Sequence, residues 1–334
     1  MSKYLYSLGV IGAGSYGTAL AQSTASKKIP VLLCCRNQDT ANRLKRDREN
    51  TKYLPGIKFE PSLEVTSDLS HLMDCCKTVL IVVPSHVFAS ILYDIKPFLT
   101  SEHRVAWATK GMDLKSGKLL SEVATDILGN TVAMASLSGP TFASELAKCM
   151  PTAIATSGTD EEFIHEIIDL LHTKTFRIYE SHDLIGMQLG GVIKNVIAIG
   201  AGLSDGLGFG ANARTALITR GLAEMTRLGV AYGATERSFM GLSGLGDLIL
   251  TCTDNQSRNR RFGFLMGQGY KPYEAVDKIG QVVEGYLMSK AVKQFSEKLG
   301  VQMPICDEVY EIIYNGKSGA DAALSLLGRS LKAE

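Results

Sequence analysis

The sequence predicts an α/β fold: a doubly wound, mostly parallel sheet flanked by helices, followed by a domain built of helices alone. Three observations predict it. Short apolar runs alternate with helix-compatible stretches in the first half of the chain, the first run leads into a glycine-rich turn, and strand-like runs cease after His182. At 334 residues the chain is long for one compact core and sufficient for two. We therefore expect one domain over residues 1–182 and a second over residues 183–334.

Five short apolar runs are the expected strands of the first domain. Each ends in a polar or glycine-containing turn, and most are separated by stretches that suit helices, a pattern typical of a parallel sheet with helical crossovers. Ligands of such sheets lie beyond the carboxyl ends of the strands, so we expect the turns that end the five runs to face one crevice. The runs are residues 6–11, 31–35, 78–83, 104–109 and 131–137.

Long helical segments dominate the second half. Two glycine-rich segments, 202–210 and 243–246, are predicted to be loops that turn back toward the first domain. The predicted helices are residues 185–202, 211–232, 260–266, 273–279, 285–299 and 304–314.

Composition excludes several classes of protein. With 35 basic and 34 acidic residues the formal charge is +1, so the chain lacks the overall basic excess typical of nucleic-acid or membrane-surface binding. Hydrophobic residues make up 45% of the chain, enough for a sizeable core. The seven cysteines include neighbours on strands, which point to opposite faces and do not readily converge on a metal. We expect free thiols, no metal site, no membrane insertion and a cytoplasmic protein.

A Gly-x-Gly-x-x-Gly turn joins the first predicted strand to a helix. Gly12 can form the tight turn, Gly14 can admit a pyrophosphate close to backbone N–H groups, and Gly17 can let helix and strand approach. This context predicts a Rossmann-type domain that binds a nicotinamide dinucleotide. The alternative is a glycine-rich turn without a nucleotide.

Arg36 ends the second predicted strand, where NAD-selective sites usually carry Asp or Glu. A guanidinium there can pair with a 2′-phosphate or stack on adenine. We predict that NADP(H) is accepted, alone or alongside NAD(H). A solvated arginine at the end of a strand is the alternative.

Lys194 is the best candidate for a catalytic group. It lies in a helical stretch that is apolar on nearly every side, where an unpaired ammonium is costly, so it either reaches solvent or points into a site. A buried lysine can donate a proton to an oxygen that gains negative charge during hydride transfer. Lys110 ends a predicted strand and can reach a substrate oxygen, although lysines there are also common on ordinary surfaces. Asp247 can pair with Lys194 or a substrate hydroxyl, or serve as a helix cap.

Residues 257–261 concentrate three arginines in an otherwise balanced chain. Arginine side chains, the Ser257 hydroxyl and the N–H groups of a helix start together suit a phosphate dianion. The alternative is a solvated basic helix face.

These residues, in this order, resemble the glycerol-3-phosphate dehydrogenase family, particularly its bacterial type. The resemblance covers nearly the whole chain, and its later motifs are more specific than the glycine turn. The matching segments are residues 9–20, 110–111, 138–143, 191–195, 244–248, 257–259 and 282–285.

The resemblance implies reversible reduction of dihydroxyacetone phosphate by NAD(P)H to sn-glycerol 3-phosphate, a precursor of glycerophospholipids, often in a homodimer. Lys194 is then the catalytic acid/base, assisted by Lys110 and Asp247. The implied substrate contacts are Lys110, Gly139, Thr141, Lys194, Asp247, Ser257, Arg258 and Asn259. The implied cofactor contacts, besides the glycine turn, are Ser15, Tyr16, Arg36, Tyr53, Lys110, Ala143, Arg258, Val282 and Glu284.

Two other functions compete. A 3-hydroxyacid or ketopantoate-type dehydrogenase also places a lysine on the first long helix of its second domain, but its carboxylate substrate needs one arginine rather than a Ser-Arg-Asn cluster. A nucleotide sensor or scaffold without catalysis has no need of Lys194, Asp247 and Arg258 together. His182 and Asp183 form a fallback acid–base pair, with a hinge or capping role as the alternative.

Overall fold

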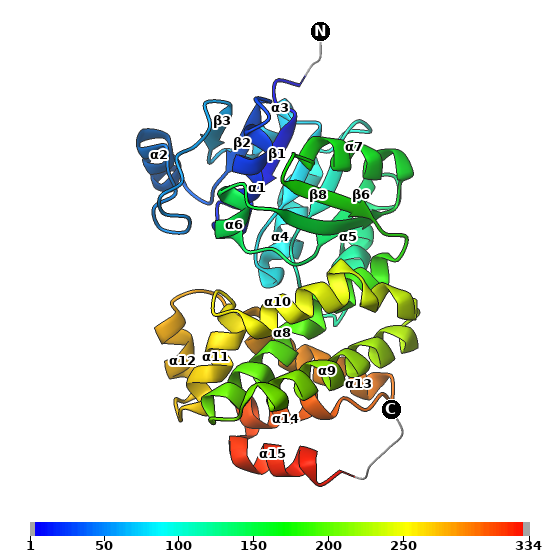
Figure 1. Cartoon of the computed structure of the whole chain (residues 1–334). Helices are drawn as coiled ribbons and strands as arrows, with labels where there is room; N and C mark the ends of the chain where they lie inside the picture. Colours follow the sequence, from blue (N-terminus) through cyan, green and yellow to red (C-terminus); the bar gives the residue numbers. More distant parts are fainter. Residues whose placement is uncertain (1–3, 330–334) are drawn as a thin grey trace. The chain divides into compact units, whose positions relative to one another are not determined.

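The computed structural model describes residues 4–329. The chain divides into two compact units. The first comprises Met1–Asp113 and Lys118–Leu184, and the second comprises Leu114–Gly117 and Ile185–Glu334. Figure 1 labels most of the helices and strands of both.

An eight-stranded sheet forms the centre of the first unit, in the order β3-β2-β1-β4-β5-β6-β7-β8. Neighbouring strands are parallel except β6 and β7, which are antiparallel. The expected mostly parallel sheet is therefore confirmed. The strands are β1 (Leu8–Ile11), β2 (Val31–Cys34), β3 (Leu63–Thr66), β4 (Thr78–Ile81), β5 (Arg104–Trp107), β6 (Ala133–Ser138), β7 (Thr152–Gly158) and β8 (Phe176–Glu180).

All five predicted strands are present, with ends displaced by one or two residues, and three strands were missed. None of the three missed strands is a continuous apolar run. β7 consists mostly of Thr, Ala, Ser and Gly, whereas β8 alternates buried Phe176 and Ile178 with exposed polar residues. The third, β3, is a four-residue strand at the edge of the sheet.

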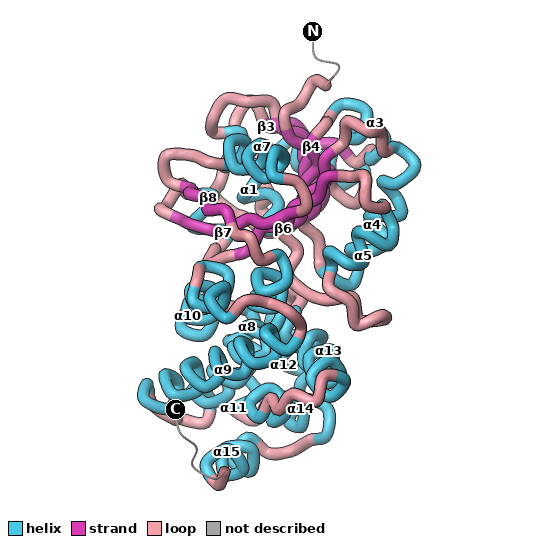
Figure 2. The backbone as a smooth tube through the Cα atoms, turned by 90° about the vertical axis from the view of Figure 1, so that its right-hand side faces the viewer, coloured by secondary structure: helices cyan, strands magenta, loops and turns pink. Residues whose placement is uncertain are grey.

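Helices cover both faces of this sheet, as the side view in Figure 2 shows. One core joins the sheet to α1, α2, α6 and α7, and the other joins it to α3, α4 and α5. This double covering buries the central strands on both faces, as a doubly wound fold requires. The helices are α1 (Ser15–Ala25), α2 (Gln38–Asp47), α3 (Leu69–Cys75), α4 (Ser85–Ile95), α5 (Leu120–Leu128), α6 (Ala143–Ala147) and α7 (Glu161–Leu171), with a short 3₁₀ turn η1 (Lys96–Phe98).

The described residues of the second unit form helices joined by loops and contain no strand, as expected. Its central helix α8 is apolar and long enough to cross a membrane by composition, but 89% of that stretch is buried inside the structure, which identifies a core helix. The helices are α8 (Leu184–Gly206), α9 (Ala211–Ala231), α10 (Asp247–Thr253), α11 (Arg258–Gly267), α12 (Pro272–Ile279), α13 (Glu284–Lys298), α14 (Pro304–Asn315) and α15 (Gly319–Leu327), with η2 (Glu236–Met240) and η3 (Leu242–Gly246).

Of the two loop predictions in this unit, that for residues 243–246 was wrong and that for residues 202–210 was right only for residues 207–210. Helix α8 continues to Gly206, and residues 242–246 form a π-helical turn that leads into α10. Glycines in this unit also allow its helices to pack closely. A Cβ on Gly190 of α8 would lie 2.5 Å from the Ser243 carbonyl oxygen, and a Cβ on Gly202 would lie 1.9 Å from that of Arg260. Helix α8 thus packs directly against the backbone of the π-helical turn and of α11.

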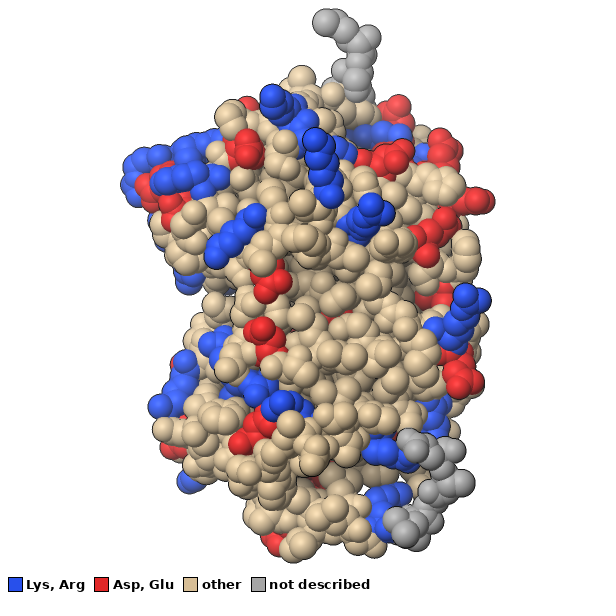
Figure 3. Space-filling view, in the orientation of Figure 1, with Lys and Arg blue, Asp and Glu red and all other residues tan. Residues whose placement is uncertain are grey.

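The surface carries both signs of charge. Figure 3 shows Lys and Arg side chains interspersed with Asp and Glu on the visible face, in keeping with the net charge of +1. All seven cysteines are free thiols.

Candidate active site

The three glycines of the turn between β1 and α1 have different surroundings. Gly12 has φ +118°, and a Cβ there would lie 2.2 Å from the Val82 carbonyl oxygen. A Cβ on Gly17 would lie 1.9 Å from the carbonyl oxygen of Gly12. At Gly14 a Cβ would meet nothing within 4 Å. Gly12 and Gly17 are therefore required by packing, whereas Gly14 borders open space.

That open space fits the pyrophosphate of a dinucleotide. Helix α1 begins at Ser15, directly after Gly14, and no side chain caps its N-terminus. The first N–H groups of a helix carry partial positive charge and attract anions. The residues at this turn thus suit a nicotinamide dinucleotide.

Three further predicted cofactor residues lie in the first unit. Arg36 is exposed two residues beyond the end of β2, just before Asn37 caps α2 by accepting a hydrogen bond from the Thr40 N–H. Tyr53 is half-buried, and the Lys52 ammonium lies 5.0 Å from its ring centroid. Ala143 is the first residue of α6, which packs against α1.

Lys110, at the carboxyl side of β5, contacts the turn that follows β6. Its Nζ donates a hydrogen bond to the Gly139 carbonyl oxygen at 2.9 Å. Gly139 has φ +156°, and a Cβ there would lie 2.7 Å from the Ile154 Cα, so only glycine fits. The nearby Thr141 hydroxyl is buried and has no protein partner. Lys110, Gly139 and Thr141 are thus gathered at one edge of the sheet.

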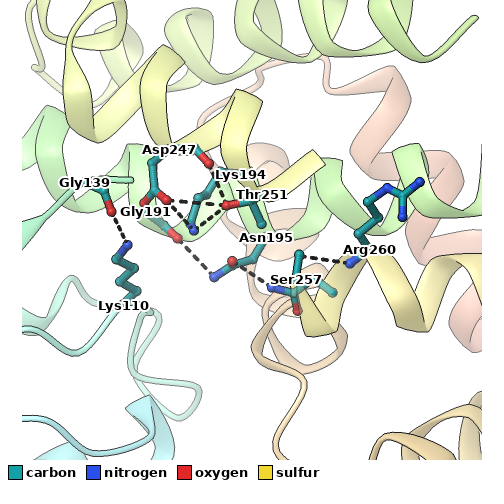
Figure 4. A network of polar contacts seen from close by, with 10 residues as sticks. Lys110, Gly139, Gly191, Lys194, Asn195, Asp247, Thr251, Ser257 and Arg260 are labelled. Atoms are coloured by element: carbon teal, nitrogen blue, oxygen red, sulfur yellow. Dashed lines mark hydrogen bonds and ion pairs between the residues drawn. The ribbon is translucent and has the colours of Figure 1, made fainter. Parts of the chain in front are cut away.

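Lys194 is buried in the second unit and does not reach bulk water. Only 6% of the residue is exposed, and its Nζ lies 2.8 Å from Asp247 Oδ1 and 2.8 Å from Thr251 Oγ1 (Figure 4). Asp247 is 1% exposed. An ammonium in this environment needs its carboxylate partner, because isolated buried charges are very costly. The pair links α8 to α10 and fixes the direction of the ammonium.

Thr251 is a site residue that the sequence analysis missed. Its hydroxyl also lies 2.6 Å from the Asp247 carbonyl oxygen, one helical turn earlier in α10. The sequence contained a sign of it: Thr251 lies four residues after the candidate Asp247, and residues at this spacing share a helix face. This spacing did not identify Thr251, because helix α10 was not among the predicted helices.

The residues of the arginine run, 257–261, have different partners and different roles. Ser257 caps α11 by accepting a hydrogen bond from the Arg260 N–H, and Arg258 is exposed and interacts electrostatically with Glu284. The Arg260 guanidinium instead forms a 2.5 Å ion pair with Asp205 of α8 and a hydrogen bond with Asn255. The expectation that three guanidiniums serve a phosphate is therefore wrong for Arg260, which holds α11 on α8.

The remaining predicted residues of the second unit lie at the starts of α11 and α13. Asn259 is buried and bonded to Asn195 and to the Gly285 N–H at the start of α13. Val282 is half-buried two residues before α13, and Glu284 is its first residue. The fallback residue His182 belongs to the first unit, where its side chain is 89% exposed and its Nδ1 lies 3.6 Å from Glu180 Oε1.

Comparisons with known proteins identify the family. Residues 7–164 match the model of the NAD-dependent glycerol-3-phosphate dehydrogenase N-terminus, and residues 183–323 match that of its C-terminus. The chain is 56% identical over 328 residues to glycerol-3-phosphate dehydrogenase [NAD(P)+] of Tolumonas auensis, covering 98% of each chain. It is 54% identical to the enzyme of the same name from Escherichia fergusonii, covering 100% of this chain and 99% of the relative.

Solved structures agree. A glycerol-3-phosphate dehydrogenase from Coxiella burnetii superposes with a TM-score of 0.94 at 41% identity, over 97% of this chain and 99% of that one. A ketopantoate reductase from Ralstonia eutropha shares the fold alone, with a TM-score of 0.59 at 14% identity over 95% and 99% of the two chains. The chain therefore belongs to the NAD(P)-dependent glycerol-3-phosphate dehydrogenase family and is an oxidoreductase that uses NAD(H) or NADP(H).

Proposed function

We propose that this protein reduces dihydroxyacetone phosphate with NAD(P)H to sn-glycerol 3-phosphate, reversibly, with Lys194 as the acid/base. The observation that carries the proposal is the buried contact of Lys194 with Asp247 and Thr251, in a unit that also presents Arg258. The bound cofactor supplies a hydride to the carbonyl carbon. The Lys194 ammonium donates a proton to the carbonyl oxygen, and the reverse reaction returns both.

The buried ion pair suits this proton transfer. Asp247 and Thr251 hold the ammonium in one orientation, so little reorganisation is needed when charge develops on the substrate oxygen. The partial exposure of Lys110 and its contact with Gly139 support a role in holding substrate and cofactor. The residues proposed to contact substrate are Lys110, Gly139, Thr141, Lys194, Asp247, Ser257, Arg258 and Asn259.

We assign cofactor binding to a domain of residues 1–182 and substrate binding mainly to a domain of residues 183–334. The open space at Gly14 and the uncapped start of α1 support the first assignment. The exposed Arg36 supports acceptance of NADP(H) through its 2′-phosphate. The residues proposed to contact cofactor are Gly12, Gly14, Ser15, Tyr16, Gly17, Arg36, Tyr53, Lys110, Ala143, Arg258, Val282 and Glu284.

The physiological setting is also proposed. A cytoplasmic homodimer that supplies glycerophospholipid synthesis, without nucleic-acid partners or membrane insertion, agrees with the balanced charge and the free cysteines. Light scattering on the purified protein tests the dimer, which a monomer mass would refute.

Substrate choice is tested by following NADPH oxidation with three ketones. We expect turnover with dihydroxyacetone phosphate and little with 2-ketopantoate or a 3-keto acid. Lys194→Ala should lower kcat with the preferred ketone by about a hundredfold or more, the usual scale for acid–base catalysis. Turnover confined to the two carboxylate substrates would overturn the assignment of substrate. Activity of Lys194→Ala within a few fold of wild type would overturn the role of Lys194.

A further inference from the structure

A buried asparagine ties the glycine turn of the first unit to the loop that joins α2 to β3. Asn50 lies in this loop, and only 2% of the residue is exposed. Its Nδ2 donates one hydrogen bond to the Ala13 carbonyl oxygen at 3.0 Å and another to Thr18 Oγ1 at 2.8 Å. A carbonyl oxygen can only accept, so the amide must face Ala13 with its nitrogen, and both N–H groups of that nitrogen are used.

The bond to the Ala13 carbonyl also sets the direction of the next N–H group. No peptide bond in residues 4–329 is cis, and the carbonyl and the following N–H of a trans peptide point in opposite directions. The Gly14 N–H is therefore turned away from Asn50. It donates to no group in the described part of the chain, and a Cβ on Gly14 would meet nothing within 4 Å. This N–H is thus directed to where an anion can accept from it.

Asn50 is the group that restrains this peptide. The Ala13 carbonyl accepts no other hydrogen bond from residues 4–329. Gly14 has an extended backbone, with φ −78° and ψ −175°, and no side chain caps α1 at this point. Because glycine rotates more freely than any other residue, the Ala13–Gly14 peptide can turn once the amide is removed.

A second buried amide attaches the same loop to the same helix without touching the glycine turn. Gln22 lies one turn after Thr18 on α1 and is 6% exposed. Its Nε2 donates to the Lys58 carbonyl oxygen at 3.1 Å, and its Oε1 accepts from the Glu60 N–H at 3.0 Å. Gln22 therefore shares with Asn50 the task of anchoring the loop, but it does not bond to Ala13.

We propose that Asn50 is a positioning residue for the dinucleotide, whose amide fixes the Ala13–Gly14 peptide so that the Gly14 N–H faces the pyrophosphate. The inference rests on the cofactor site proposed above, which places the pyrophosphate at Gly14. Without the amide the peptide rotates and the charge-assisted hydrogen bond to the phosphate weakens. The groups that react are untouched, so affinity for the dinucleotide falls while turnover at saturation is kept.

The experiment compares wild type, Asn50→Ala and Gln22→Ala by fluorescence titration with NADPH and with NADH. We expect Asn50→Ala to raise the Kd of both dinucleotides by about tenfold and by the same factor, since both contain the pyrophosphate and a hydrogen bond to a charged group contributes this much. Its kcat at saturating NADPH should stay within about twofold of wild type, because only binding is lost.

Gln22→Ala is the matched control. It removes an amide that is buried on the same helix and holds the same loop, so urea unfolding should show a loss of stability similar to that of Asn50→Ala. Its Kd values for NADPH and NADH should match those of wild type, because the Ala13–Gly14 peptide keeps its bond to Asn50.

Three results would overturn the proposal: unchanged Kd values in Asn50→Ala, an equal loss of affinity in Gln22→Ala, or a fall in kcat without a change in Kd. Should Asn50→Ala fail to fold, Asn50→Asp keeps the shape and can accept from the Thr18 hydroxyl, but its carboxylate repels the Ala13 carbonyl. It is judged by the same comparison. An error in the proposed position of the pyrophosphate is seen separately, as normal NADPH affinity in Gly14→Ala.

Discussion

Lys194 and Asp247 are 53 positions apart in the chain, yet their side chains form a buried ion pair of 2.8 Å. The pair joins α8 to α10, and the side chains are only 7% and 2% exposed. Such a pair stabilises a fold weakly compared with apolar packing, but removing one partner leaves an uncompensated charge. Stability should therefore fall when one of the two charges is removed and recover when both are removed, whereas activity should be lost in either case.

Asp247→Asn tests whether activity and stability respond differently. Loss of the carboxylate should destabilise the fold by about 3–5 kcal/mol and lower kcat by about a hundredfold. The double variant Lys194→Met/Asp247→Leu removes both charges, so it should regain most of the lost stability while remaining inactive. Urea unfolding and NADPH oxidation measure the two quantities. A double variant no more stable than Asp247→Asn would show that the cost lies elsewhere.

Thr251→Val should reduce kcat by about tenfold without unfolding the protein. The substitution keeps the shape of the side chain but removes the hydroxyl that bonds Lys194, and a hydrogen bond to a charged group contributes about 1.5–3 kcal/mol. Thr253→Val is the matched control on the same helix, because that hydroxyl is exposed and bonds only to the Ile249 carbonyl oxygen. Equal activity of the two variants would remove Thr251 from the site.

The three glycines of the turn after β1 should respond differently to alanine. Gly14→Ala meets no protein atom, so it should fold with near-normal stability and bind NADPH more weakly by about tenfold. Gly17→Ala meets the Gly12 carbonyl oxygen at 1.9 Å and should lose about 1–3 kcal/mol of stability or more. Thermal unfolding and fluorescence titration with NADPH measure both effects. Normal NADPH affinity in Gly14→Ala would contradict the position assigned to the pyrophosphate.

Arg36→Asp should shift the ratio of kcat/KM for NADPH to that for NADH by about tenfold or more in favour of NADH. The reason is that a carboxylate repels the 2′-phosphate and accepts a hydrogen bond from a ribose 2′-hydroxyl. Arg46 is an exposed arginine of the neighbouring helix α2, and Arg46→Asp should leave the ratio unchanged. If Arg36→Asp also leaves it unchanged, Arg36 does not contact the cofactor.

Glu224 should make stability depend on pH. Burial raises the pKa of this carboxyl from 4.5 to about 7, although it accepts hydrogen bonds from the N–H groups of Ile305 and Cys306. A raised pKa means that the folded state binds the proton more tightly than the unfolded state. The resulting stabilisation is present in full below about pH 4.5 and is lost as pH rises through about 7.

Glu224→Gln should remove this contribution, which amounts to roughly 3 kcal/mol across that interval. The free energy of unfolding, measured by urea denaturation between pH 4.5 and 8, should therefore depend less on pH in the variant. Identical pH profiles would show that Glu224 is not protonated in this range.

The sequence by itself determined the parts of this protein that local chemistry encodes. A strand, a glycine turn and a helix specify the conformation around Gly12 because steric limits act between near neighbours. The apolar surroundings of Lys194 predicted that the ammonium would either reach solvent or point into a site, since burial of a lone charge is costly.

Only the tertiary structure decided which groups become partners. It paired Lys194 with Thr251 as well as Asp247, diverted Arg260 to Asp205, and joined Asn195 to Asn259. It also formed the π-helical turn from residues predicted to be a loop. These outcomes depend on how closely α8 packs against α10 and α11, a long-range result of side-chain volume that the periodicity of a single segment does not contain.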